Sequence, residues 1–241
     1  MCVLTTVEGV GISDMAAGIV RRYSLADEPP PLLLYVDSDC CSAQGGSKVL
    51  QMFAPWDKLQ VRLDIWHFMR RFASCCTPDA YQLYGVFMAK LSAFIFKWDG
   101  DDLKALYTSK RAELSKYGVV GLSEQDFAGR VTRRELALHC RRTTRGVEDT
   151  TRLIDHVIQT LDSSQGRDTM GVLLFNYECT QQMWKEQRRH VTCIQDVAEI
   201  PLYTKTGSLM KGGVELPTYR CARGSTSLES FHNHLARFIP G

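Results

Sequence analysis

Apolar residues in the first third of the chain alternate between helical spacing and short continuous runs. Apolar residues three to four positions apart predict a helix over Ser13–Tyr23. The run Leu32–Asp37, which follows three prolines, is typical of a strand covered on both faces. Cys2–Thr6 predicts an earlier strand, so strand, helix and strand would open an α/β sheet.

The same patterns continue the sheet briefly and then become mostly helical. A helix over Ser42–Phe53, a strand over Gln60–Leu63 and a helix over Ile65–Cys76 come next. The helices predicted after Thr77 are Pro78–Phe96, Asp101–Tyr117, Arg133–Cys140, Val147–Leu161 and Thr180–Val191. Residues 201–219 are rich in glycine and strand-like, which predicts a hairpin or an extended excursion. A T-x-x-E capping box begins a last helix near Ser227.

This order of elements predicts an α/β core that a large, mostly α-helical insertion interrupts. We expect the N-terminal part of the core at residues 1–76 and the insertion at 77–222, with the extended glycine-rich segment inside it. Residues 223–241 would return to the core as its final helix, which carries Glu229.

Composition narrows the class of protein. The 241 residues are 44% hydrophobic and carry a net charge of only +2, so any surface for a polyanion must be local. The nine cysteines are an odd number in a large chain whose N-terminus lacks a signal-peptide pattern, which favours reduced thiols in the nucleus or cytoplasm over secretion. The apolar runs are shorter than the roughly 18 residues of a membrane helix, so no membrane partner is expected.

Three acids stand at the expected edges of the sheet. Asp37 and Asp64 each end a predicted strand, and Glu229 lies in the first turn of the last helix. Clustered carboxylates can hold two divalent cations that activate the attacking oxygen and stabilise the leaving oxygen of a phosphodiester. The alternative is structural, because acids at these places also cap helices and turns. Asp39 is open to both interpretations.

Two stretches of the sequence resemble a known family. "LLLYVDSDCCSAQGGSKVLQMFAPWDKLQVRLDIWHFMRRF" and "GSTSLESFHNHL" are similar to the Asp-containing and Glu-containing segments of Mutator-like transposases. The resemblance implies a ribonuclease-H-like fold and DNA cleavage and strand transfer with Mg²⁺ or Mn²⁺. Asp37 would match the second catalytic Asp and Glu229 the catalytic Glu, both as metal ligands, while Asp64 and His67 match an auxiliary motif.

The first catalytic Asp of that family has no match here. The chain therefore resembles a fragment with an incomplete ribonuclease-H-like core, and we predict weak metal binding and no strand transfer from it alone. Two functions stay open: a DNA-processing transposase domain, or a non-catalytic remnant that binds DNA or protein. Transposases commonly act as dimers, so a homo-oligomer is also possible.

Basic residues gather in one part of the predicted insertion. Arginine binds phosphate through paired hydrogen bonds, so this group is the candidate DNA surface: Arg130, Arg133, Arg134, Arg141, Arg142 and Arg145. The alternative is a solvated helix face with Glu135, Glu148 and Asp149 as partners.

Aromatic and sulfur-containing residues allow further interpretations. Trp98 and Trp184 can stack on bases, but core packing is the simpler expectation. The vicinal pairs Cys40-Cys41 and Cys75-Cys76 are expected to be small buried hydrophobic residues. A structural zinc site is a further alternative for three groups of metal-ligand types, although their spacings match no standard zinc finger: His139 with Cys140, His190 with Cys193, and Cys221 with His232 and His234.

Overall fold

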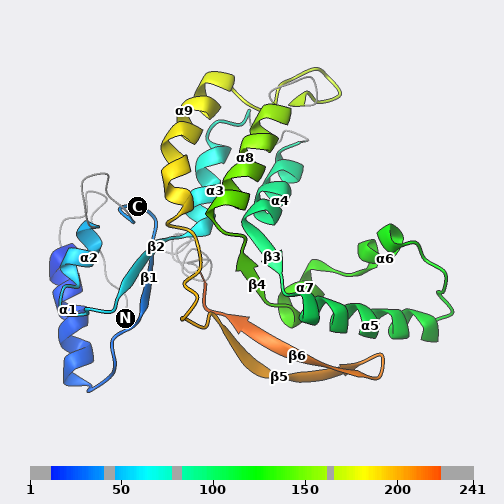
Figure 1. The fold of residues 1–241 in the computed structure, drawn as a ribbon, viewed down its shortest axis with the longest axis horizontal. Helices are drawn as coiled ribbons and strands as arrows, with labels where there is room; N and C mark the ends of the chain where they lie inside the picture. Colours follow the sequence, from blue (N-terminus) through cyan, green and yellow to red (C-terminus); the bar gives the residue numbers. More distant parts are fainter. Residues whose placement is uncertain (1–11, 41–46, 78–82, 162–165, 224–241) are drawn as a thin grey trace, which may run out of the picture. The chain divides into compact units, whose positions relative to one another are not determined.

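The computed structural model describes residues 12–40, 47–77, 83–161 and 166–223, which form mixed α/β structure with short sheets. The chain divides into two compact units. Unit 1 comprises residues 1–88, 154–195 and 224–241, and unit 2 comprises residues 89–153 and 196–223. Figure 1 labels the helices and strands of both units.

Unit 1 begins with two parallel strands and two helices. Helix α1 (Ile12–Leu25) leads to strand β1 (Leu33–Val36), and helix α2 (Lys48–Met52) leads to strand β2 (Gln60–Leu63). The strands pair in register, with Leu33 opposite Gln60 and Val36 opposite Leu63. Both helices lie beside this strand pair in Figure 1. A hydrophobic cluster joins the helices to the strands, and it contains Ala16, Phe53, Trp56, Leu59 and the half-buried Leu34.

Three of the early predicted elements, α1, β1 and β2, are confirmed, with one correction to the burial of β1. Strand β2 has the predicted bounds, and α1 and β1 lie where they were expected. All four residues of β1 are half-buried, so the expectation of a strand covered on both faces is wrong. The reason is that, among the described residues, β1 has one strand neighbour, β2. The predicted strand Cys2–Thr6 and the helix near Ser227 lie outside the described residues.

Helices complete unit 1 around an aromatic core. They are α3 (Ile65–Ala73), the first part of α4 (Tyr84–Ile95), the second part of α8 (Val147–Leu161), α9 (Tyr177–Gln187) and a 3-10 helix, η2 (Arg188–Val191). Neighbouring ring centroids are 4.9 to 6.2 Å apart along the series Phe68, Phe72, Phe87 and Phe175, with Trp184 against Phe72. Core packing is thereby confirmed for Trp184, which is 6% exposed, whereas the same expectation is wrong for Trp98, which is 36% exposed.

A disulfide joins α3 to α9 inside unit 1. Cys75 follows α3 and Cys179 lies in the first turn of α9, and their Cα atoms are 5.5 Å apart. The expectation that all nine cysteines are reduced is therefore wrong for this pair. A pairing across 104 positions leaves no signal in local sequence.

Unit 2 combines two antiparallel strand pairs with three whole helices and with the remaining parts of α4 and α8. Strand β3 (Phe96–Trp98) pairs with β4 (Arg142–Thr144), and β5 (Tyr203–Lys211) pairs with β6 (Val214–Cys221). The helices are α5 (Gly100–Lys116), α6 (Glu124–Arg130) and α7 (Arg133–His139). Buried Leu106, Cys140 and Leu216 form a core that joins α5, β6 and the end of α7. The predicted hairpin is confirmed, and its tip is a Gly-Gly turn with both glycines at positive φ.

The two units divide the chain differently from the predicted bounds. Residues 154–195, which were placed in an insertion over 77–222, belong to unit 1 with the N-terminal strands. The α3–α9 disulfide and the aromatic core provide the physical reason, because both join helices from distant parts of the chain. In the described ranges no helix is both long and apolar enough to cross a membrane.

Candidate functional site

Asp37 lies at the carboxyl end of β1, as the sequence predicted. It is exposed, and its Oδ1 accepts a hydrogen bond from Ser38 Oγ at 2.9 Å. Arg71 of α3 donates one hydrogen bond to the Asp37 carbonyl at 2.7 Å and another to Gln187 of α9 at 2.5 Å. One arginine therefore anchors the loop after β1 to two helices, and the Asp37 carboxylate stays on the surface.

The neighbouring acids Asp39 and Asp64 cap helices. Asp39 has a left-handed backbone (φ 54°), and its Oδ2 accepts from the Val49 amide in the first turn of α2 at 2.9 Å. Asp64 is 2% exposed and its Oδ1 accepts from the Trp66 amide at 2.7 Å, which makes it the N-cap of α3. His67 Nδ1 lies 4.0 Å from Asp64 Oδ2. The cap interpretation of Asp39 is confirmed, and Asp64 has a structural role whatever else it does.

The second ligand of the predicted Mg²⁺ or Mn²⁺ site, Glu229, lies outside the described residues. Within the described ranges, Asp37 belongs to no group of three or more candidate ligands whose atoms lie close together. The hard-cation site therefore stays a prediction that rests on the resemblance.

A different group of candidate ligands gathers in unit 1. Cys40 follows the loop that carries Asp37, His190 lies in η2, and Cys193 comes three residues later. One ligand atom from each of the three lies within 4.8 Å of the others, and Cys40 Sγ is 3.3 Å from His190 Nδ1. Each of the three residues is 8% exposed. The amide of Leu63, the last residue of β2, donates to the Cys193 carbonyl at 3.0 Å, so the cluster is attached to the strand pair.

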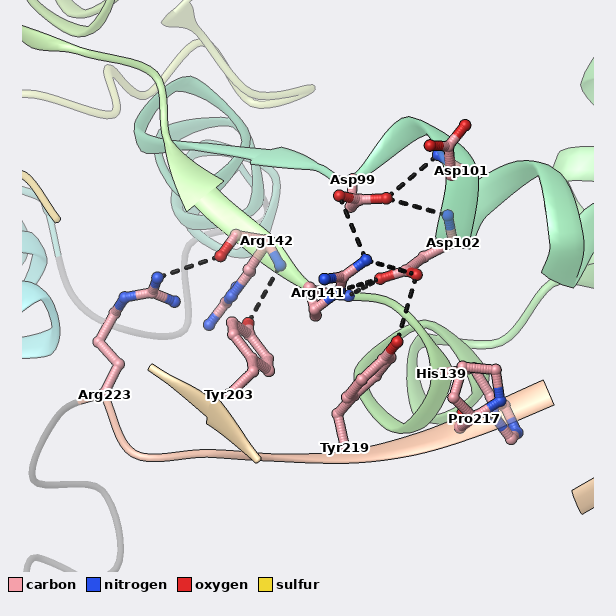
Figure 2. Close-up of polar contacts among 10 residues, drawn as sticks. All are labelled: Asp99, Asp101, Asp102, His139, Arg141, Arg142, Tyr203, Pro217, Tyr219 and Arg223. Atoms are coloured by element: carbon pink, nitrogen blue, oxygen red, sulfur yellow. Dashed lines mark hydrogen bonds and ion pairs between the residues drawn. The ribbon is translucent and has the colours of Figure 1, made fainter. Parts of the chain in front are cut away.

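Unit 2 contains a polar network around Asp102 (Figure 2). Arg141 donates from Nε at 2.7 Å, from Nη2 at 3.0 Å and from its backbone amide at 2.9 Å to the two carboxylate oxygens of Asp102. Tyr219 donates to Asp102 Oδ1 at 3.5 Å and lies under the Arg141 guanidinium. Burial alone would raise the pKa of Asp102, but the hydrogen bonds and charge of Arg141 outweigh it, so the pKa is lowered. The pair is ionised at neutral pH and joins the start of α5 to β4.

Two more of the predicted DNA-binding arginines contribute to structure. The Arg142 guanidinium lies 3.9 Å from the centre of the Phe96 ring. The backbone carbonyl of Arg142 accepts a hydrogen bond from Arg223 at 3.1 Å (Figure 2). Arg145 Nε donates to the Ala93 carbonyl at 2.8 Å. Arg141, Arg142 and Arg145 are all half-buried. Arg141 contacts α5 and β6, Arg142 contacts β3, and Arg145 contacts α4.

The other three predicted arginines are exposed at the corner between α6 and α7. Arg130 ends α6, while Arg133 and Arg134 begin α7 after the N-cap Thr132. We call these three residues the arginine corner. The sequence grouped six arginines together, and the structure separates them into this corner and three that pack.

Acids near the arginine corner have other partners. Glu124 pairs with Arg111 at 2.6 Å, and Asp126 accepts from Ser123 Oγ at 2.6 Å. Glu135 is buried, completes the capping box of α7 and accepts from two lysines, Lys110 at 3.0 Å and Lys211 at 2.7 Å. Asp149, another expected partner of the arginines, pairs with Arg152 at 3.2 Å. Glu124, Glu135 and Asp149 are therefore paired with cations outside the corner, whereas Asp126 accepts a hydrogen bond from a neutral hydroxyl and keeps its negative charge.

Comparisons with protein-family models, with curated proteins and with solved structures found no match to this chain.

Proposed function

We propose that this chain is a transposase-derived DNA-binding domain that contacts phosphates through the arginine corner. The observation that carries the proposal is the exposure of Arg130 at the end of α6 and of Arg133 and Arg134 at the start of α7, with Glu124 and Glu135 paired to other cations. The resemblance to Mutator-like transposases suggests DNA as the ligand, and the guanidinium groups of the arginine corner are suited to binding its phosphates.

The electrostatics of α7 support a ligand at this corner. Arg133 and Arg134 occupy the first turn of the helix, where the partial positive charge of the backbone disfavours cations. Two arginines there cost some stability, and an anion would remove that cost. DNA phosphates are anions that paired guanidinium hydrogen bonds fit well. Because the net charge of the whole chain is only +2, such binding depends on this local charge.

The test is a titration of a fluorescent DNA duplex, followed by anisotropy at about 50 mM salt. The variant Arg130→Ala/Arg133→Ala/Arg134→Ala should bind about 10- to 1,000-fold more weakly, since each lost phosphate contact removes one counterion-release contribution. The matched control removes three exposed positive charges from unit 1 instead: Arg21→Ala/Lys48→Ala/Lys58→Ala. Its affinity should stay within about threefold of the parent. Equal losses in both variants would overturn the assignment to the corner.

Phosphodiester cleavage is a second candidate function, favoured by the exposed position of Asp37 at the carboxyl end of a parallel strand. It would require Mg²⁺ or Mn²⁺ at Asp37 and Glu229. We expect no cleavage of supercoiled plasmid by this chain with Mg²⁺, because the resemblance leaves the first acid of the site unmatched. Cleavage that the Asp37→Ala variant loses would establish the enzyme instead.

A further inference from the structure

We propose that Cys40, His190 and Cys193 form a binding site for Zn²⁺ inside unit 1. The inference rests on the two sulfurs and the imidazole alone and is independent of the DNA-binding proposal. Thiolate and imidazole are the ligands that zinc prefers in proteins, and they are poor ligands for the Mg²⁺ or Mn²⁺ that the sequence suggested. The site would therefore be a second kind of metal centre, close in sequence to Asp37 but chemically separate from it.

The distances suit tetrahedral coordination. With zinc bonds of about 2.3 Å to sulfur and about 2.05 Å to nitrogen, a tetrahedral site places sulfur and nitrogen about 3.6 Å apart and two sulfurs about 3.8 Å apart. Cys40 Sγ and His190 Nδ1 are already 3.3 Å apart, and all three ligand atoms lie within 4.8 Å of one another. Ligation thus requires shifts of about 1 Å or less, which side-chain rotation can supply.

The backbone holds the three ligands in place before any metal binds. Cys40 comes directly after Asp39, whose carboxylate is fixed to the first turn of α2. The Cys193 carbonyl is bonded to the end of β2, and the Cys193 amide donates to the His190 carbonyl at 2.9 Å. The site therefore takes one ligand from the loop after β1 and two from a turn attached to β2. Zinc would link both strands at the edge where Asp37 lies.

The two ring nitrogens of His190 have different neighbours. Arg189 Nε donates to His190 Nε2 at 3.3 Å, and Nδ1 is the nitrogen that lies next to Cys40 Sγ. Zinc would therefore bind through Nδ1, with a ring proton on Nε2, and Arg189, which is exposed, would turn into solvent. Each cysteine would lose its thiol proton on binding, and the two thiolates would balance the charge of the cation.

Three protein ligands leave the fourth coordination position to water or to another donor. The first measurement uses the unmodified chain, purified without metal and titrated with Zn²⁺ or Co²⁺. We expect one metal ion per chain, the sulfur-to-metal absorption and visible bands of a tetrahedral cobalt thiolate site, and protection of Cys40 and Cys193 from alkylation on mass spectrometry. Failure to retain one zinc ion per chain after dialysis, or equal alkylation of both thiols with and without zinc, would overturn the site.

Variants then identify the ligands. Cys40→Ser and Cys193→Ser should each weaken zinc binding at least about 100-fold, because each removes one of three ligands. The control is Cys221→Ser, which changes an exposed thiol in unit 2 and should leave the affinity unchanged. Wild-type affinity in both ligand variants would contradict the proposal even if the unmodified chain bound zinc. DNA binding by the arginine corner is measured separately, so the two proposals can fail independently.

Discussion

Glu135 is a strongly stabilised carboxylate of unit 2, and its replacement by glutamine is a quantitative test of the structure. Burial alone would raise its pKa, yet hydrogen bonds from Lys211, Lys110 and Thr132 lower it from 4.5 to about 2. These bonds join α7 to α5 and β5, with Lys211 at 2.7 Å and the Thr132 amide at 2.9 Å. The ionised form is therefore favoured by the fold.

The magnitude follows from the shift in pKa. A difference of about 2.5 units between the unfolded and folded chain corresponds to about 3 kcal/mol of stability at pH 7. Glu135→Gln should remove most of this, because the amide carries no charge and faces two ammonium groups. The expected fall in the melting temperature of unit 2 is about 10–20 °C at pH 7.

The pH dependence gives the sign of the effect. Because the folded pKa is below the unfolded value, the stabilisation is complete above about pH 4.5 and is lost as pH falls toward 2. Urea unfolding of the parent and of Glu135→Gln, measured from pH 7 down to pH 3, should show a difference that roughly halves by about pH 3. The control is Glu124→Gln, an exposed ion pair that should cost under about 1 kcal/mol. A loss below 1 kcal/mol at pH 7 for Glu135→Gln, or a difference independent of pH, would refute the reasoning.

Three further predictions concern other parts of the fold. Arg141→Lys keeps the charge but loses the paired hydrogen bonds, so urea unfolding of unit 2 should show a loss of about 1–2 kcal/mol. Reduction with dithiothreitol should destabilise unit 1 by about 4–5 kcal/mol, as expected for a cross-link across 104 positions. The same treatment should leave the melting temperature of the control variant Cys75→Ala/Cys179→Ala unchanged, because that variant has no such disulfide to reduce. Gly212→Ala should destabilise more than Gly213→Ala by at least about 1 kcal/mol in urea unfolding, because a Cβ at Gly212 would lie 2.3 Å from a carbonyl oxygen of α5, whereas one at Gly213 meets nothing within 4 Å.

Elements with local signals could be predicted from the sequence. Val147–Leu161 and Gln60–Leu63 have the predicted bounds, since apolar spacing and the flanking acid Asp64 mark them. The hairpin follows from its Gly-Gly turn. In contrast, β3 and β4 are three residues each, which is too short for any periodicity to show, and they pair across more than 40 positions. Helix α6 was missed because it buries one residue, Phe127.

The candidate sites show the same limit. The sequence placed Asp37 at a strand end and drew attention to His190 and Cys193, but it assigned Cys40 to packing. Cys40 and His190 are 150 positions apart, and no spacing motif connects them. Similarly, the sequence grouped six arginines as one surface, while the pairing of Arg141 with Asp102 across 39 positions depends on tertiary structure. Contacts between distant segments decide which of these residues can meet a ligand.

The salt dependence of DNA binding tests the central claim most directly. The logarithm of the binding constant should fall linearly with the logarithm of salt concentration between about 50 and 250 mM, with a slope proportional to the phosphates contacted. If Arg130, Arg133 and Arg134 each contact a phosphate, their combined replacement by alanine should make the slope shallower by about 2.7, while the unit 1 control variant keeps the parent slope. Parallel lines for the parent and the corner variant would contradict the account.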